Sequence, residues 1–214
     1  MSFRVVQDYY RRELFDFFRP YASPFWAVTF ELEIGGALEE LRRRQYPIYL
    51  NLCYLFTRAA QPLEDLRYRL REGEIVLHDR LHAGVTVPAA GGRFRFTYYD
   101  DEPEIERFNA RLAADGAAGE DAGLGVRVDR DRAWLFFSSL PKIPFTGLTH
   151  AYPDPQDDEP RVSFGRFREQ GERRFMPVGL QVNHRFVDGA VVGELVERAQ
   201  SALDGFSRGY NRKP

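Results

Sequence analysis

Segments of alternating apolar and polar residues recur along this chain between segments with helical apolar spacing, and this limits the folds open to it. Residues 26–34 alternate with period two over their second half, which is typical of a half-buried strand. Residues 190–203 instead place apolar side chains at positions 192, 195, 196, 199 and 203, which share one face of a helix. Strands and helices that interleave in one chain predict an α/β layer architecture.

The other segments predict that the sheet is mixed. Two hairpins are expected, one turning at Glu72-Gly73 between strands 68–71 and 74–78, and one at Gln170-Gly171 between strands 162–168 and 175–183. Further strands are expected at 83–87, 94–99 and 134–140, and further helices at about 9–18, 37–44, 47–60 and 103–112, with Gly35-Gly36 ending the first long strand. The predicted fold class is α/β, a two-layer sandwich in which helices cover one face of a mixed β-sheet and segment 47–60 is buried.

Two segments read as loops. Residues 113–125 consist mainly of Ala, Gly, Asp and Glu with little to bury, which favours a mobile loop over a domain linker. Residues 152–160 are acidic and proline-rich. A chain of 214 residues suits one large core, so we expect a single domain over residues 1–214.

Composition excludes several classes of function. The formal net charge of −2 gives no electrostatic reason to expect a nucleic acid partner. No apolar run approaches the length that spans a bilayer and no leader opens the chain, so we expect no membrane partner and a cytoplasmic protein. The single cysteine, Cys53, lies in an apolar run and is expected to be an inert core thiol.

One histidine is a candidate catalytic residue. His184 leaves the predicted strand 175–183 and precedes Asp188-Gly189 and a helix, so an imidazole and a carboxylate share one turn. Alone, this pattern is weak, because Asp-Gly turns are common and a turn histidine needs no function.

The residues around His184 strengthen the hypothesis that it is catalytic. The string from Met176 to Gly189 resembles the signature of chloramphenicol acetyltransferases, in which a strand leads into His-His-x-x-x-Asp-Gly. Further blocks match that family in the same order along the chain: residues 10–15, 46–49, 71–79 and 139–147. Collinear matches are more specific than any single motif.

The resemblance implies a fold, a reaction and an assembly. His184 would be the general base that takes a proton from the hydroxyl of a small-molecule alcohol while its oxygen attacks the thioester of acetyl-CoA. Asp188 would form a buried ion pair with Arg11 and brace the turn. The family also implies a homotrimer, with His184 of one subunit facing the substrate pocket of the next, and a role in antibiotic resistance.

The chain departs from the family pattern at the oxyanion donor. Gly147 stands where the family has a serine, and Thr146 and Ser163 are the candidates to replace its hydrogen bond. Asn183 replaces the first histidine of the family pair and Lys142 replaces a tryptophan. These changes, with altered aromatic shapes near the antibiotic pocket, put chloramphenicol itself in doubt as the natural substrate.

The resemblance also indicates a coenzyme site. Arg166 and Phe167 match a basic residue followed by an aromatic near the coenzyme, and Ser163 is assigned to the same region, so these three are expected to bind acetyl-CoA. The other histidines, His78, His82 and His150, lack ligand-like spacing, so no metal is predicted.

Three alternatives stay open. The string Asn183-His184-Arg185-Phe186-Val187-Asp188-Gly189-Ala190 is also similar to the signature of dihydrolipoamide acyltransferase catalytic domains. A catalytically silent relative that binds CoA or a small ligand would explain Gly147, although retention of His184, Asp188 and Arg11 together argues against it. An unrelated metabolic protein that shares these blocks is the third.

Overall fold

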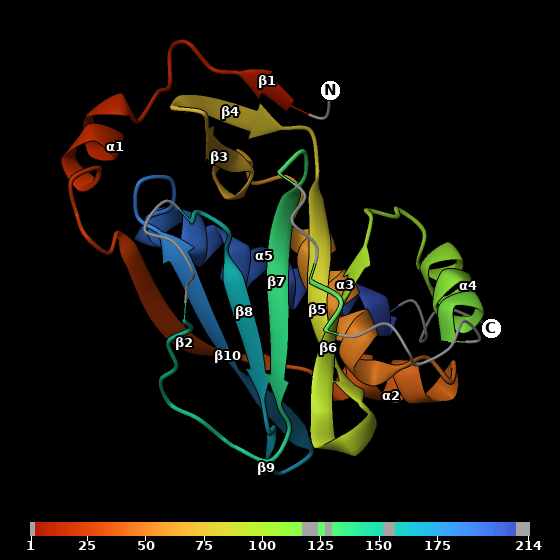
Figure 1. Ribbon diagram of the computed structural model, residues 1–214. Helices are drawn as coiled ribbons and strands as arrows, with labels where there is room; N and C mark the ends of the chain where they lie inside the picture. Colours follow the sequence, from red (N-terminus) through yellow and green to blue (C-terminus); the bar gives the residue numbers. More distant parts are fainter. Residues whose placement is uncertain (1–2, 117–123, 127–129, 152–156, 209–214) are drawn as a thin grey trace.

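A mixed sheet of seven strands forms the centre of the molecule (Figure 1). The computed structural model describes residues 3–116, 124–126, 130–151 and 157–208. The strand order is β2-β10-β8-β7-β5-β6, with β9 on β10; β5–β7 and β7–β8 pair in parallel and the other pairs are antiparallel. The strands are β2 (Phe25–Glu33), β5 (Leu81–Ala89), β6 (Arg93–Tyr99), β7 (Ala133–Leu140), β8 (Arg161–Gly165), β9 (Arg168–Gln170) and β10 (Arg173–Asn183). The predicted mixed sheet is confirmed.

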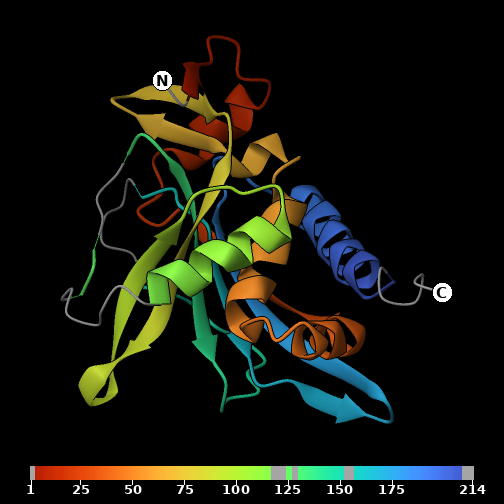
Figure 2. The ribbon, with the colours of Figure 1, turned by 90° about the vertical axis from the view of Figure 1, so that its right-hand side faces the viewer.

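Helices cover one face of this sheet, as the two ribbon views show (Figures 1 and 2). The α-helices are α1 (Arg12–Phe18), α2 (Gly35–Arg43), α3 (Ile48–Ala60), α4 (Ile105–Gly116) and α5 (Gly189–Arg208), with short 3-10 helices η1 (Glu64–Leu66) and η2 (Ala90–Gly92). Helices α2, α3 and α5 pack together behind the strands. The described helices include none that is long and apolar enough to cross a membrane.

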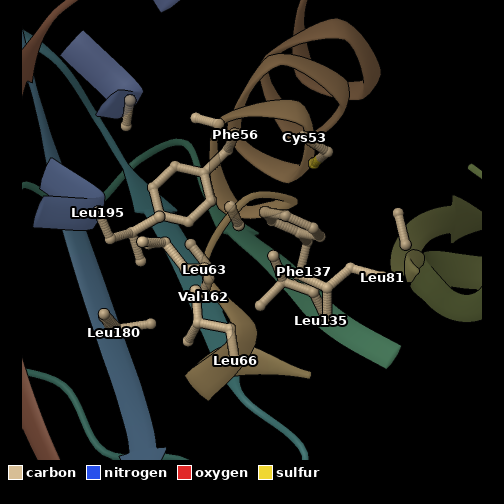
Figure 3. Close-up of a cluster of buried hydrophobic side chains, with 14 of the residues drawn as sticks. Cys53, Phe56, Leu63, Leu66, Leu81, Leu135, Phe137, Val162, Leu180 and Leu195 are labelled. Carbon is tan, nitrogen blue, oxygen red and sulfur yellow. The ribbon is translucent and has the colours of Figure 1, made fainter. Parts of the chain in front are cut away.

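The core lies between these helices and the sheet (Figure 3). Cys53 and Phe56 from α3 meet Leu135 and Phe137 from β7, and Leu195 of α5 closes the other side. The segment expected to be buried is therefore buried, and burial raises the pKa of the Cys53 thiol far above its ordinary value, as an inert core cysteine requires.

A second, three-stranded sheet stands beside the large one. It is ordered β1-β4-β3 and consists of β1 (Phe3–Val5), β3 (Tyr68–Arg71) and β4 (Glu74–His78). The hairpin predicted at Glu72-Gly73 is confirmed, and both residues have positive φ (50° and 85°), the turn that matches strand twist. Strand β1 was not predicted, because three residues carry no readable period and their partner lies about seventy residues away in sequence.

Two glycine segments behave differently from the sequence prediction. Strand β2 ends just before Gly35-Gly36, as expected, but the two glycines already belong to α2, which was expected to begin at about residue 37. A Cβ at Gly36 would lie 2.8 Å from Cβ of Ser207 in α5. Segment 162–168 is not one strand, because it breaks after Gly165, where Arg166 N–H donates to the carbonyl of Ile143 at 2.9 Å. The acceptor lies in the loop that follows β7, so a contact distant in sequence, not the local pattern, ends the strand.

The predicted loops are described only in part. Residues 113–116 belong to the end of α4 and are helical rather than loop. Residues 117–123 and 152–156, on which the remainder of the two loop predictions falls, lie outside the described residues. Helix α4 begins at residue 105, two residues after the predicted start at Pro103, because Pro103 lies in a bend that precedes the helix.

The face of the sheet away from the helices carries small and polar side chains in register. Val85, Phe137 and Val162 point into the core, so their chain neighbours Thr86, Ser138 and Ser163 point to the opposite face. Ser138 pairs with Ser163, and Ser163 pairs with Gly179 of β10. The loop 141–151, defined here as the crossing loop, lies over this row, with the Phe145 ring 3.2 Å from a Cβ built at Gly179.

Candidate active site

The end of strand β10 places His184 outside the sheet. Its backbone N–H donates to the Pro24 carbonyl at 2.8 Å, and the N–H groups of Phe186 and Val187 donate to the Asn183 carbonyl at 3.1 and 3.0 Å. These bonds make a tight turn between the sheet and α5. The imidazole is therefore held at a fixed point by backbone bonds on both sides.

The ring of His184 is positioned by aromatic contacts. It stacks on Phe18 with ring centroids 4.2 Å apart and an interplanar angle of 12°, and Trp26 lies 5.4 Å away. Its Nδ1 is buried and has no hydrogen-bond partner among the described residues. Trp26 is fixed in turn, because its Nε1 donates to the Val187 carbonyl at 3.1 Å.

Asp188 ties the turn to the first helix. Its Oδ2 lies 2.6 Å from Nη2 of Arg11, while its Oδ1 accepts the N–H groups of Ala190 and Val191 at 3.0 and 3.1 Å and caps α5. The structure thus brings together the two residues expected to pair. One carboxylate fixes both the start of the helix and the N-terminal segment.

Arg11 makes two further bonds that the sequence did not indicate. It is 8% exposed, and its Nη1 donates to the Phe186 carbonyl at 3.1 Å and lies 3.3 Å from Oδ1 of Asp65. Burial, the largest single influence, lowers the pKa of Arg11, but the Asp188 carboxylate together with Tyr9 and Tyr10 outweighs it, and the pKa is raised. Asp65 follows no motif near His184, so only the fold could reveal it.

A cavity of about 530 Å³ opens on the face of the sheet away from the helices. This is the size range of small-molecule sites. Aromatic side chains form much of its wall and polar groups the rest; the lining includes Thr86, Phe94, Phe96, Tyr98, Phe136, Phe137, Ser138, His150, Asp157 and Arg161. Arg161 is engaged by a short ion pair with Asp157. The cavity can enclose an apolar molecule and offer it hydrogen bonds at one side.

His184 is not among the residues that line this cavity. The cavity wall nevertheless reaches the end of β10 that precedes His184: Asn183 Nδ2 donates to the carbonyl of the lining residue Asp157 at 3.1 Å, and Gln181 pairs with the lining residue Arg161.

The crossing loop carries the two residues at the place of the oxyanion donor. Thr146 and Gly147 are both exposed, and a Cβ built at Gly147 would meet no atom within 4 Å. The Thr146 hydroxyl has no hydrogen-bond partner among the described residues. No hydrogen bond to a described residue therefore fixes the Thr146 side chain, and there is space for a side chain at Gly147 beside it.

The residues expected to bind coenzyme lie on and after β8. Ser163 is fully buried, and its Oγ lies 3.2 Å from Nε2 of His150. Arg166 is exposed, and no acidic side chain among the described residues pairs with it. Phe167 packs partly on the core. From the sequence, His150 is considered only as a possible metal ligand, because no sequence pattern indicates that its ring contacts Ser163.

The remaining histidines have structural surroundings. His82 Nδ1 lies 3.2 Å from Oδ1 of Asp100. His78 is buried, neither of its ring nitrogens has a hydrogen-bond partner in the described structure, and burial, helped by Arg69 and Arg71, lowers its pKa to about 3. Within the described residues there is no cluster of His, Cys, Asp and Glu that could hold a metal ion.

Solved structures define the class of protein that has this fold. The catalytic domain of the Azotobacter vinelandii dihydrolipoamide acetyltransferase covers 90% of this chain and 86% of its own, with a TM-score of 0.65 at 17% identity. A chloramphenicol acetyltransferase structure agrees more fully, with a TM-score of 0.86 at 25% identity over 94% of this chain and 99% of that one. The fold is that of acyltransferase catalytic domains.

The sequence comparisons then give the family. The family model described as chloramphenicol acetyltransferase matches residues 1–200, and the chain belongs to that family. The chloramphenicol acetyltransferase of Streptomyces acrimycini is 26% identical over 210 residues and covers 90% of both chains. That of Proteus mirabilis is 24% identical over 198 residues, 91% of this chain and 90% of the relative. This confirms the predicted family and fold class, and the chain is an acyltransferase.

Proposed function

We propose that this protein transfers an acetyl group from acetyl-CoA to a hydroxyl group of a small molecule, with His184 as general base. The observation that carries the proposal is the braced turn: an imidazole with no hydrogen bond on Nδ1, next to a carboxylate that is paired with Arg11 and caps a helix. Family membership supports the acyl chemistry.

The reaction balances without an acyl-enzyme. The substrate hydroxyl oxygen attacks the thioester carbonyl carbon while His184 accepts the hydroxyl proton, and a tetrahedral oxyanion forms. When the carbon–sulfur bond breaks, its electron pair goes to sulfur, and the imidazolium returns the proton to give the free thiol of CoA. A neutral imidazole can take this proton near pH 7.

The site would be shared between copies of the chain in a homotrimer, with His184 of one copy facing the cavity of the next. The absence of His184 from the residues that line the cavity of its own chain supports this. The aromatic surface beside His184 supports it as well, because Phe17 and Tyr21, which contact the Phe18 ring that stacks on His184, are 58% and 47% exposed in a single copy. Asp188 and Arg11 would act on the base only by holding its turn.

Acetyl-CoA would approach from the side of β8 and the crossing loop. Arg166 has its charge unpaired among the described residues and can meet a phosphate of the coenzyme, while Phe167 and Ser163 border the same strand. The acceptor would be an alcohol with an apolar or aromatic body that fits the 530 Å³ cavity; chloramphenicol and related antibiotics are the first to test.

The test follows free thiol release from acetyl-CoA with a panel of hydroxyl acceptors that includes chloramphenicol. His184→Ala is the control. Release that depends on an acceptor and vanishes in the variant is the expected result. Measurable CoA binding without acceptor-dependent release would contradict the proposal and favour the second candidate, a silent CoA- or ligand-binding relative, for which the absent side-chain donor at Gly147 is the specific observation.

A further inference from the structure

The crossing loop holds His150 firmly against strand β10. Its backbone N–H donates to Oε1 of Gln181 at 2.7 Å, and Nε2 of Gln181 donates back to the His150 carbonyl at 3.3 Å. Gln181 is itself buried in β10. This reciprocal pair fixes the backbone of His150, and the side chain lines the 530 Å³ cavity.

Ser163 decides which ring nitrogen of His150 carries the proton. The Ser163 hydroxyl is fully buried, and the one hydrogen-bond partner that the described residues offer it is Nε2 of His150, at 3.2 Å. A buried hydroxyl that donated to nothing would be costly, so the hydroxyl donates and Nε2 accepts. The proton of the neutral ring is then on Nδ1, because the hydrogen bonds of His150 to described residues engage only its backbone and Nε2.

The ring also stays neutral. Burial lowers the pKa of His150, and the nearby charge of Arg161 lowers it further. Arg161 comes from β8, Gln181 from β10 and Asp157 from the segment before β8; Asp157 is already paired with Arg161. A neutral ring with one N–H is a hydrogen-bond donor that does not compete with the base for protons.

From this geometry we propose that His150 is a catalytic residue that donates a hydrogen bond from Nδ1 to the oxyanion of the tetrahedral intermediate. This rests on the acetyl transfer proposed above, in which negative charge develops on the acyl oxygen and needs a fixed donor. Gly147 offers no side-chain donor, and the Thr146 hydroxyl is exposed and unheld. Ser163 is a positioning residue that acts through the imidazole.

The experiment compares two substitutions at one position in the full-length protein. His150→Asn keeps an N–H near Nδ1, whereas His150→Leu removes it at similar volume. With the acceptor that the wild type uses, we expect His150→Leu to lower kcat by about 10²–10³-fold with KM values for acceptor and acetyl-CoA within about threefold, and His150→Asn to retain at least ten times more turnover than the leucine variant.

Two further variants test the assigned roles. Ser163→Ala should lower kcat less than His150→Leu, and the double variant should be no slower than His150→Leu alone, because the hydroxyl acts only through the ring. Gly147→Ser, for which the crossing loop has space, should restore part of the kcat lost in His150→Leu.

Three results would overturn the proposal. These are equal losses in His150→Leu and His150→Asn, a loss confined to the KM of the acceptor, or a larger kcat loss from Thr146→Val than from His150→Leu. Circular dichroism checks that each variant folds, and the Ser163 series gives an independent reading if His150→Leu does not. The wild type and His184→Ala, assayed in parallel, report separately on the acetyl transfer itself.

Discussion

Two regions of the molecule each hold an imidazole, and they hold it by opposite means. In the turn after β10, the ring of His184 touches the aromatic rings of Phe18 and Trp26, and its Nδ1 makes no hydrogen bond with a described residue. In the crossing loop, Gln181 fixes the backbone of His150 and Ser163 bonds its ring.

The difference follows from what each ring would do. A general base must gain and release a proton while its ring stays in place. Its brace is therefore placed on the backbone, through Asp188 and the bond of Arg11 to the Phe186 carbonyl. A donor to an oxyanion must keep its proton and its direction, which side-chain hydrogen bonds provide.

The largest expected effect tests the base. His184→Gln keeps a polar side chain but cannot shuttle a proton, so kcat should fall by about 10²–10⁴-fold. Initial rates of thiol release with saturating acetyl-CoA measure it. The same change at His150 preserves a hydrogen-bond donor and should lower kcat less. A larger loss of kcat at His150 than at His184 would contradict the comparison between the two regions.

The next effect tests the brace. Arg11→Met removes the buried cation of an ion pair whose carboxylate is 34% exposed, so it should lower the free energy of unfolding by about 2 kcal/mol, less than for a fully buried pair, together with kcat, because Asp188 is left without its cation. Urea denaturation and thiol release measure the two quantities. Arg12→Met is the matched control: its pair with Asp16 is 4.0 Å long and exposed, so a change within about 0.5 kcal/mol is expected.

A pair of glycine substitutions tests the crossing loop. A Cβ at Gly165 would lie 2.9 Å from the Ile143 carbonyl oxygen, so Gly165→Ala should destabilise the protein by about 1–3 kcal/mol and displace the loop that carries His150. Gly147→Ala meets open space and should leave thermal stability unchanged. Thermal unfolding of both variants would show whether this loop is held as tightly as its contacts indicate.

The remaining effect appears only below neutral pH and concerns His78, which shares with His184 a ring without hydrogen-bond partners in the described structure but is fully buried. Its folded-state pKa of about 3 lies below the ordinary 6.5, so the folded state binds fewer protons. Stability is then full above pH 6.5 and falls by up to about 1.4 kcal/mol per pH unit as pH decreases toward 3. His78→Phe should reduce the difference between the unfolding free energies at pH 7 and pH 5. An unchanged difference would mean that other groups cause the pH dependence.

Much of the fold could be predicted from the sequence, because the patterns that indicate strands, turns and helices are local. Alternation predicted β2 and β6, the Glu72-Gly73 pair predicted its hairpin, and apolar spacing predicted α5. Local patterns do not report close approaches between elements. The contact of α5 on Gly36 and the crossing loop at Gly165 were missed for this reason, since only the packed molecule brings those backbones together.

The sequence by itself determined the strand–turn–helix that carries His184, the nearby Asp188, the family and the mixed sheet, because residues near one another in sequence encode them or a collinear family pattern does. Only the tertiary structure decided that Asp65 joins Arg11 and that Gln181 and Ser163 hold His150. These contacts join segments with no shared period, and their free energy exists only after the sheet has set its register.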